Sequence, residues 1–122
     1  MGLAPRAVLL IASLSLALPA SAQPRTQLVS DLAFAMGQTH ALRQVCNGPG
    51  DQYWRDRMSA MIGFEAPDPA ARAPLAERFN DGFRVARQQY PRCTLQSRAA
   101  ERSAAAHGKV LAGLLARGPA SR

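Results

Sequence analysis

The chain has 122 residues, 48% of them hydrophobic, and its 15 Lys and Arg residues against 8 Asp and Glu residues give a formal net charge of +7. This length allows one domain with a modest hydrophobic core. The chain has no CxxCH motif, which excludes covalently bound c-type haem, and no HExxH or paired CxxC spacing that would indicate a zinc site.

Residues 1–22 have the features of a secretory signal peptide. Arg6 supplies a positive charge, an apolar run of about 12 residues follows, and Ala20 and Ala22 stand in the A-x-A arrangement of a cleavage site. The run is shorter than the roughly 20 residues that cross a bilayer as a helix. We therefore expect cleavage after Ala22, one mature domain over residues 23–122, and a periplasmic location without stable membrane insertion. An uncleaved membrane anchor is the alternative.

Both cysteines, Cys46 and Cys93, lie in the expected mature domain. An exported chain meets an oxidising compartment, and an even number of cysteines there is typical of disulfide pairing. A Cys46–Cys93 bond would close a loop of about 48 residues, for which the chain-entropy model gives about 4 kcal/mol of stabilisation. We expect this disulfide rather than a free nucleophilic thiol.

The positive charge comes almost entirely from arginine, since all but one of the basic residues are Arg. A basic surface attracts nucleic acid, anionic lipid or acidic cell-wall polymer. Export argues against nucleic acid as the partner. The alternative is that Arg replaces Lys for compositional reasons, as in products of GC-rich genomes, and that the charge has no specific function.

The first half of the mature chain predicts two helices. Over residues 26–46, apolar residues recur at alternating spacings of four and three, the stripe of an amphipathic helix. Gly37 costs this helix about 1 kcal/mol relative to Ala, which is tolerable if another helix packs closely there. Residues 47–50, Asn-Gly-Pro-Gly, end the helix. Asp51 is the expected N-cap of a second helix that ends near Glu65.

The second half predicts two further helices. Asp68, followed by proline, is a helix start, and Pro74 predicts either a separate first turn or a later start of the main helix. Thr94 is the expected cap of a last helix that ends near Arg117. The apolar positions of this last helix are Leu95, Ala99, Val110, Leu111, Leu114 and Leu115. The sequence therefore predicts an all-α fold, a small antiparallel bundle of about four helices stapled by one disulfide.

The turn between the first two helices gathers the residues best able to bind a ligand. His40, Arg43, Trp54, Arg55 and Arg57 lie on either side of it. An aromatic ring with several guanidinium groups can bind carboxylate, phosphate or sugar. These five residues form the candidate binding surface, and an envelope protein or an acidic cell-wall component is the expected partner. The alternative is structural: Trp54 belongs to the core and the arginines form surface ion pairs.

No catalytic residue, metal ligand or cofactor is predicted. The two histidines are far apart, the serines lack a GxSxG setting, and no spacing pairs the carboxylates. Two alternatives to a binding module stay open. One is a small hydrolase-like enzyme that uses His40 with Asp51 or Glu65, and the other is a metal or haem binder.

Several motifs together resemble a known family. They are Gly37-x-x-His40-x-Leu42-Arg43-x-x-Cys46, Asp51-Gln52-x-Trp54-Arg55-x-Arg57-Met58, Glu65-Ala66-Pro67, Phe79-Asn80-x-Gly82 and Pro91-x-Cys93-Thr94. Over residues 28–116 the chain is similar to a family of small exported alphaproteobacterial proteins, a domain of unknown function with two well-separated cysteines. The resemblance implies a periplasmic, disulfide-bonded protein and no particular activity. Phe83 stands where this family's pattern leads us to expect Tyr, so a ring hydroxyl is dispensable there.

Overall fold

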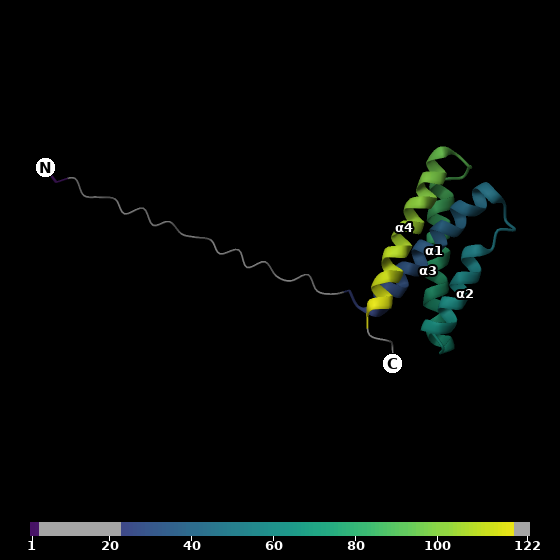
Figure 1. Cartoon of the computed structure of the whole chain (residues 1–122), viewed down its shortest axis with the longest axis horizontal. Coiled ribbons are helices and arrows are strands. Elements are labelled where there is room, and N and C mark those ends of the chain that lie inside the picture. The colour runs from purple at the N-terminus through teal and green to yellow at the C-terminus, as the bar shows by residue number, and fades with distance from the viewer. Residues whose placement is uncertain (3–22, 119–122) are drawn as a thin grey trace.

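The computed structural model describes residues 1–2 and 23–118 (Figure 1). The predicted signal peptide, apart from its first two residues, and its cleavage site lie outside this part. The described chain forms α1 (Arg25–Asn47), α2 (Tyr53–Glu65), α3 (Pro69–Gln89) and α4 (Leu95–Arg117). No strand occurs among the described residues, and the predicted all-α class is confirmed. Within the same residues, no helix has both the length and the hydropathy to span a bilayer.

Helix α1 lies at the centre of the bundle, and each of the other helices packs on it (Figure 1). One apolar cluster joins Ala33 and Met36 of α1 to Met58 of α2 and Phe79 of α3. A second cluster joins α1 to Leu111 of α4. In the described part of the chain, the backbone of α4 approaches α1 alone and comes close to neither α2 nor α3. The bundle is therefore open along both sides of α4.

Helices α1 and α3 approach closely at two buried glycines. A Cβ atom added at Gly37 would lie 1.9 Å from the carbonyl oxygen of Phe79, and one added at Gly82 would lie 2.1 Å from the carbonyl oxygen of Phe34. Any side chain at either position would meet the backbone of the facing helix. The condition that makes Gly37 tolerable is therefore met, and the missing Cβ atoms explain why glycine stands in the interior of both helices.

The start of α2 differs from the prediction. Gln52 occupies the N-cap position, and its side chain makes no capping hydrogen bond. Asp51 lies one residue earlier, where its carboxylate accepts a hydrogen bond from the backbone N–H of Tyr53 at 3.2 Å. The caps of the next two helices are as predicted: Asp68 caps α3, and Thr94 opens α4 with a capping box.

Helix α3 is continuous through Pro74, so neither a separate first turn nor a later start occurs. Pro74 and Ala70, whose carbonyl loses its helical partner, are both exposed. Water can therefore satisfy that carbonyl, and the proline does not end the helix.

The inner face of α4 is narrower than its apolar sequence indicated. Leu111 is buried, but Leu95, Val110 and Leu114 are exposed. Because the backbone of α4 comes close to α1 alone, only a narrow stripe of its surface can be buried. The exposed residues follow from this one-sided packing.

The predicted disulfide between Cys46 and Cys93 is present, with a Cα–Cα distance of 4.8 Å. It joins the last turn of α1 to the residue before the cap of α4. At the opposite end of α4, the Nη1 atom of Arg25 donates a hydrogen bond to the carbonyl oxygen of Leu115 at 3.1 Å. Helix α4 is thus held to α1 at both ends, covalently at one of them.

Candidate functional site

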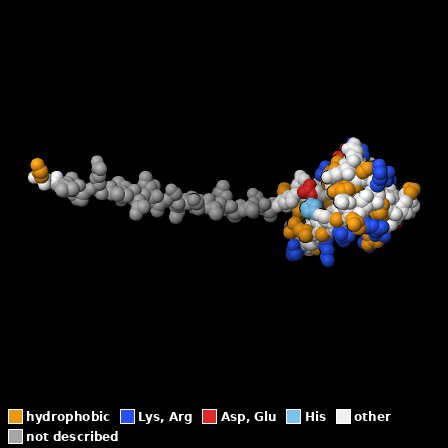
Figure 2. Space-filling view, turned by 90° about the horizontal axis from the view of Figure 1, so that it is seen from above, with side chains coloured by type: hydrophobic (Ala, Val, Ile, Leu, Met, Phe, Trp, Pro, Cys, Tyr) orange, Lys and Arg blue, Asp and Glu red, His pale blue; other side chains and the backbone are white. Residues whose placement is uncertain are grey.

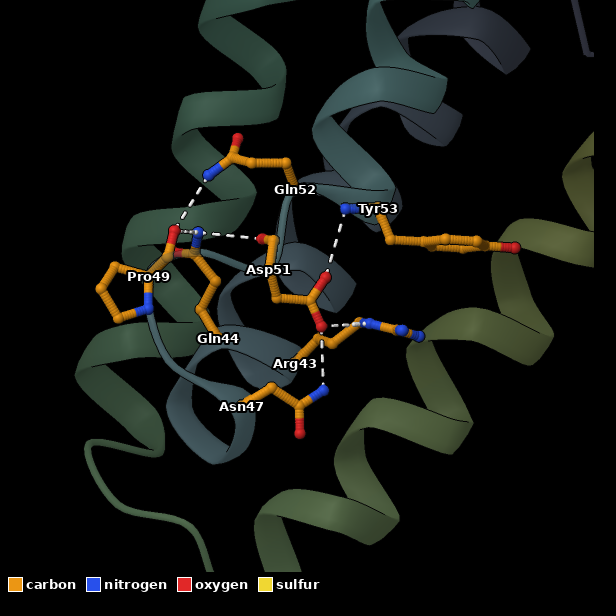
Figure 3. A network of polar contacts seen from close by, with 7 residues as sticks. All are labelled: Arg43, Gln44, Asn47, Pro49, Asp51, Gln52 and Tyr53. Atoms are coloured by element: carbon orange, nitrogen blue, oxygen red, sulfur yellow. Dashed lines mark hydrogen bonds and ion pairs between the residues drawn. The ribbon is translucent and has the colours of Figure 1, made fainter.

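The carboxylate of Asp51 organises the turn between α1 and α2 (Figure 3). Its Oδ2 atom accepts hydrogen bonds from Nε of Arg43 at 2.5 Å and from Nδ2 of Asn47 at 2.8 Å. Its Oδ1 atom faces the N–H of Tyr53. The hydrogen bond from Asn47 is the main cause that lowers the pKa of Asp51, and the Arg43 and Tyr53 donors act in the same direction. Asp51 is therefore a charged anchor of the turn.

Two glutamine side chains close the same turn (Figure 3). The amide nitrogens of Gln44 and Gln52 each donate a hydrogen bond to the carbonyl oxygen of Pro49 at 3.0 Å. Gln44 also donates to the backbone oxygen of Asp51 at 3.1 Å. Because both amide nitrogens are engaged, the orientation of each side chain is fixed, and each presents its amide oxygen elsewhere.

An aromatic and two guanidinium groups stack at the start of α2. The Cζ atoms of Arg43 and Arg57 lie 4.6 Å and 4.2 Å from the centroid of the Tyr53 ring, within the range of cation–π contacts. Trp54 meets the same ring edge-on, with centroids 5.2 Å apart. Tyr53 is nevertheless 42% exposed, so this arrangement forms an accessible basic and aromatic surface.

Beside this stack, a groove of about 550 Å³ runs between α2 and α4. We call it the α2–α4 groove. Its floor is α1, with Leu32, Ala35, Met36 and Thr39, and the Thr39 hydroxyl already donates to the Ala35 carbonyl at 2.8 Å. The α2 wall carries Tyr53, Trp54, Arg57 and Met61, and the α4 wall carries Ala104, Ala105, Gly108, Lys109 and Ala112. The groove is therefore apolar at its base, with one cation on each wall.

His40 lies on the other side of the turn and is only 3% exposed. Its ring packs against Phe79 and Phe83, with centroids 5.4 Å and 5.6 Å away. The Nδ1 atom is sealed from solvent and has no hydrogen-bond partner among residues 1–2 and 23–118. Burial is the main cause that lowers the pKa of His40 below its ordinary value of 6.5, and the positive charge of Arg55 lowers it further, partly offset by Asp51. The imidazole is therefore held neutral at pH 7.

The imidazole of His40 lines a small polar hollow of about 280 Å³ between α1, α2 and α3. We call it the His40 hollow. Its other lining residues are Gln44, Gln52, Arg55, Phe79, Asn80 and Phe83. It shares no lining residue with the α2–α4 groove, so the two features are separate places on the molecule.

The structure divides the candidate binding surface between these two places. His40 and Arg55 line the His40 hollow, whereas Trp54 and Arg57 line the α2–α4 groove. Arg43 lines neither and lies over the Tyr53 ring while it bonds Asp51. Trp54 also packs against the apolar cluster around Met58. One part of its side chain therefore belongs to the core while another lines the groove.

The acid partners considered for His40 lie elsewhere. Asp51 is engaged with Arg43 and Asn47, and Glu65 pairs with Arg25 at 2.5 Å. Neither carboxylate makes a hydrogen bond to His40 among the contacts of the described chain. In the same part of the chain, no group of three or more His, Cys, Asp and Glu side chains gathers as a metal site would require.

Sequence reasoning missed three contributors to these sites. Tyr53 is not part of the predicted binding surface, yet two arginines stack on its ring. Lys109 was overlooked although it is the chain's lysine and lies on the groove wall. The small residues of α4 also line the groove, and the run of alanines and glycine with one cation is the available sequence signal for a groove wall.

The comparisons with known proteins place the whole helical part of the chain in a single family. No curated protein and no solved structure matches the chain. A family model described as a protein of unknown function (DUF2385) matches residues 24–117, a range that spans all four helices. The chain belongs to this family of unknown function, DUF2385.

Proposed function

We propose that this chain is an exported binding module of the bacterial cell envelope that works in the periplasm. The signal-peptide features of residues 1–22 support export. The Cys46–Cys93 bond supports an oxidising compartment, because disulfides persist there and are rare in the cytosol. The basic side chains spread over the visible face of the bundle fit an acidic environment (Figure 2).

The observation that carries the binding role is the α2–α4 groove. Its floor of Leu32, Ala35 and Met36 is apolar, and Arg57 and Lys109 stand on opposite walls. Groove residues of this kind accept the apolar stripe of an amphipathic helix, with charged residues of the helix flanking that stripe. Cations on both walls favour acidic residues on both flanks. The partner is therefore an envelope protein with an acidic amphipathic helix.

Small residues on the α4 wall strengthen this assignment. Ala104, Gly108 and Ala112 are one helical turn apart in succession and line the groove. Side chains of this size let a second helix backbone come close. An acidic cell-wall polymer would use the cations but would leave the apolar floor uncovered, so it fits less well.

Photo-crosslinking in cells tests the groove as the docking site. A photoreactive residue at Ala112, which is exposed and lines the groove, should crosslink to one envelope protein. The matched control is Ala116, one turn later on α4, exposed and outside the groove. Charge reversal of Arg57 and Lys109 to Glu should abolish the Ala112 crosslink, whereas reversal of Arg102 on α4 should not.

The partner identified in this way must carry the expected helix. Replacing its acidic flank residues with Lys should restore the crosslink to the charge-reversed variant. Equal crosslinking from positions 112 and 116, or a crosslink that survives the double charge reversal, would overturn the groove as the docking site. Crosslinks to cell-wall material in place of protein would favour the acidic polymer.

A further inference from the structure

The His40 hollow contains a buried polar group without a partner. Isolated polar atoms in protein interiors cost free energy unless a hydrogen bond satisfies them. His40 is only 3% exposed, its Nδ1 atom has no hydrogen-bond partner among the described residues, and its side chain lines a hollow of about 280 Å³. Because Nδ1 is sealed, a molecule in the hollow would meet the ring through Nε2.

The hollow also contains an unpaired positive charge. Arg55 lines it, and its guanidinium group takes part in none of the ion pairs or cation–π contacts of the described residues. Arg55 lies in the first turn of α2, where the exposed N–H groups of the helix favour a negative charge. The His40 ring, which the hollow can reach only through Nε2, and an unpaired guanidinium group therefore line one small polar space.

We propose that the His40 hollow is a binding site for a small carboxylate, held by the guanidinium group of Arg55 and by an N–H of the His40 ring. A planar carboxylate matches the planar fork of an arginine side chain and can accept two hydrogen bonds from it. The amide oxygens of Gln44 and Gln52, whose nitrogens are fixed on Pro49, can accept from a hydroxyl or amine carried beside the carboxylate. Asn80, exposed on α3, supplies a further amide.

Proton binding to His40 is coupled to this site. Arg55 from α2 opposes a charge on the imidazole and Asp51 from the turn favours it, while α3 presents the uncharged side chains of Phe79, Asn80 and Phe83. A bound carboxylate offsets the charge of Arg55 and stabilises imidazolium. Carboxylate binding therefore raises the pKa of His40 and becomes tighter as the pH falls, by at most about tenfold per pH unit for one linked proton.

Nitrogen-detected NMR of the imidazole rings in the oxidised mature protein tests this proposal. Acetate is titrated at constant ionic strength, with sodium chloride and acetamide as the comparison titrations. Acetate should shift the His40 ring nitrogens saturably and raise the pH at which they titrate, while chloride and acetamide should not. The His107 ring, on exposed α4 surface, is the internal reference and should stay unchanged.

Matched variants on α2 separate the site from a general basic surface. Arg55→Gln should abolish the saturable acetate response, and Arg57→Gln, whose guanidinium lies on the Tyr53 ring, should retain it. A response to chloride as well would show an adventitious ion only. That outcome, a response to acetamide, equal effects of the two variants, or no saturable shift would each overturn the carboxylate site. The α2–α4 groove shares no residue with this site, so the crosslinking experiment succeeds or fails independently.

Discussion

At the residue scale, the most informative side chain is His40, because its environment opposes protonation. Its pKa in the folded protein lies below the ordinary 6.5, so the unfolded chain binds more protons than the folded chain as the pH falls below 6.5. Unfolding is therefore favoured by acid in this range. Stability contributed by the neutral imidazole is complete above pH 6.5 and is lost progressively below it.

The lowered pKa of His40 predicts a testable pH dependence of the free energy of unfolding. The free energy of unfolding, measured by urea titration, should fall as the pH drops from 7 towards 5, with a slope of at most about 1.4 kcal/mol per pH unit. His40→Gln should flatten the slope, because its amide does not titrate. His107→Gln, which changes an exposed imidazole on α4, is the control and should leave the slope in place.

Asp51 carries the second residue-scale prediction. Asp51→Ala removes the acceptor shared by Arg43, Asn47 and the Tyr53 N–H, and should lower the free energy of unfolding by about 1–3 kcal/mol. Because the pKa of Asp51 is lowered in the folded state, this contribution should disappear in acid below the ordinary value of 3.8. Asp56→Ala, an exposed change in the first turn of α2, should have a much smaller effect in the same urea titration.

At the element scale, the close contact between α1 and α3 restricts positions 37 and 82 to glycine. Gly37→Ala would drive a methyl group into the Phe79 carbonyl, 1.9 Å from the new atom. Neither backbone can yield without separating the two helices. We expect a loss of at least about 3 kcal/mol, the upper part of the usual range for overpacking, measured by thermal or urea unfolding.

Gly108→Ala is the matched control, since Gly108 is also an interior helix residue. Its added Cβ would lie 3.6 Å from Cδ1 of Leu32, an ordinary van der Waals distance. The substitution should therefore stabilise the protein by up to about 1 kcal/mol through helix propensity. Similar effects of the two substitutions would contradict the close α1–α3 crossing.

Most elements were predictable because their signals are local. Asp68 and Thr94 were recognisable as caps, and the Asn-Gly-Pro-Gly sequence marked the end of α1. The helix break predicted at Pro74 was wrong because the effect of a proline depends on whether water can reach the carbonyl of Ala70, which the sequence does not reveal. The N-cap role predicted for Asp51 was wrong because an aspartate before a helix can either cap the helix or organise the preceding turn. Which of the two occurs here depends on Arg43 and Asn47 across the turn.

The sequence alone could not predict that the candidate binding surface is divided between the His40 hollow and the α2–α4 groove. His40, Arg55 and Arg57 are all close to one turn, so proximity along the chain predicted one surface. Residues 55 and 57 differ by about 200° around a helix, and this rotation places one in the His40 hollow and the other in the α2–α4 groove. Which side of α1 each face meets depends on the packing angle of α2, a tertiary property.

At the scale of the whole molecule, the disulfide is the main covalent constraint. Reduction should lower the free energy of unfolding by about 4 kcal/mol, because the 47-residue separation of Cys46 and Cys93 restricts the unfolded chain. Urea titrations with and without dithiothreitol measure the difference. The Cys46→Ser/Cys93→Ser variant should match the reduced protein and show no response to reductant, and an equal loss in that variant on adding dithiothreitol would contradict the assignment.

The attachment of α4 to α1 determines how the α2–α4 groove accommodates ligands of different size. One wall of the α2–α4 groove is tied to the floor by a covalent bond near its first turn and by Arg25 near its last. The opposite wall, α2, is held by side-chain packing, by the ion pair of its last residue, Glu65, with Arg25, and by its two connecting turns, but no disulfide of the described chain reaches it. A bulkier ligand is therefore accommodated at the lowest free-energy cost by outward movement of α2. In that case α4 is the fixed wall of the groove and α2 is the wall that moves.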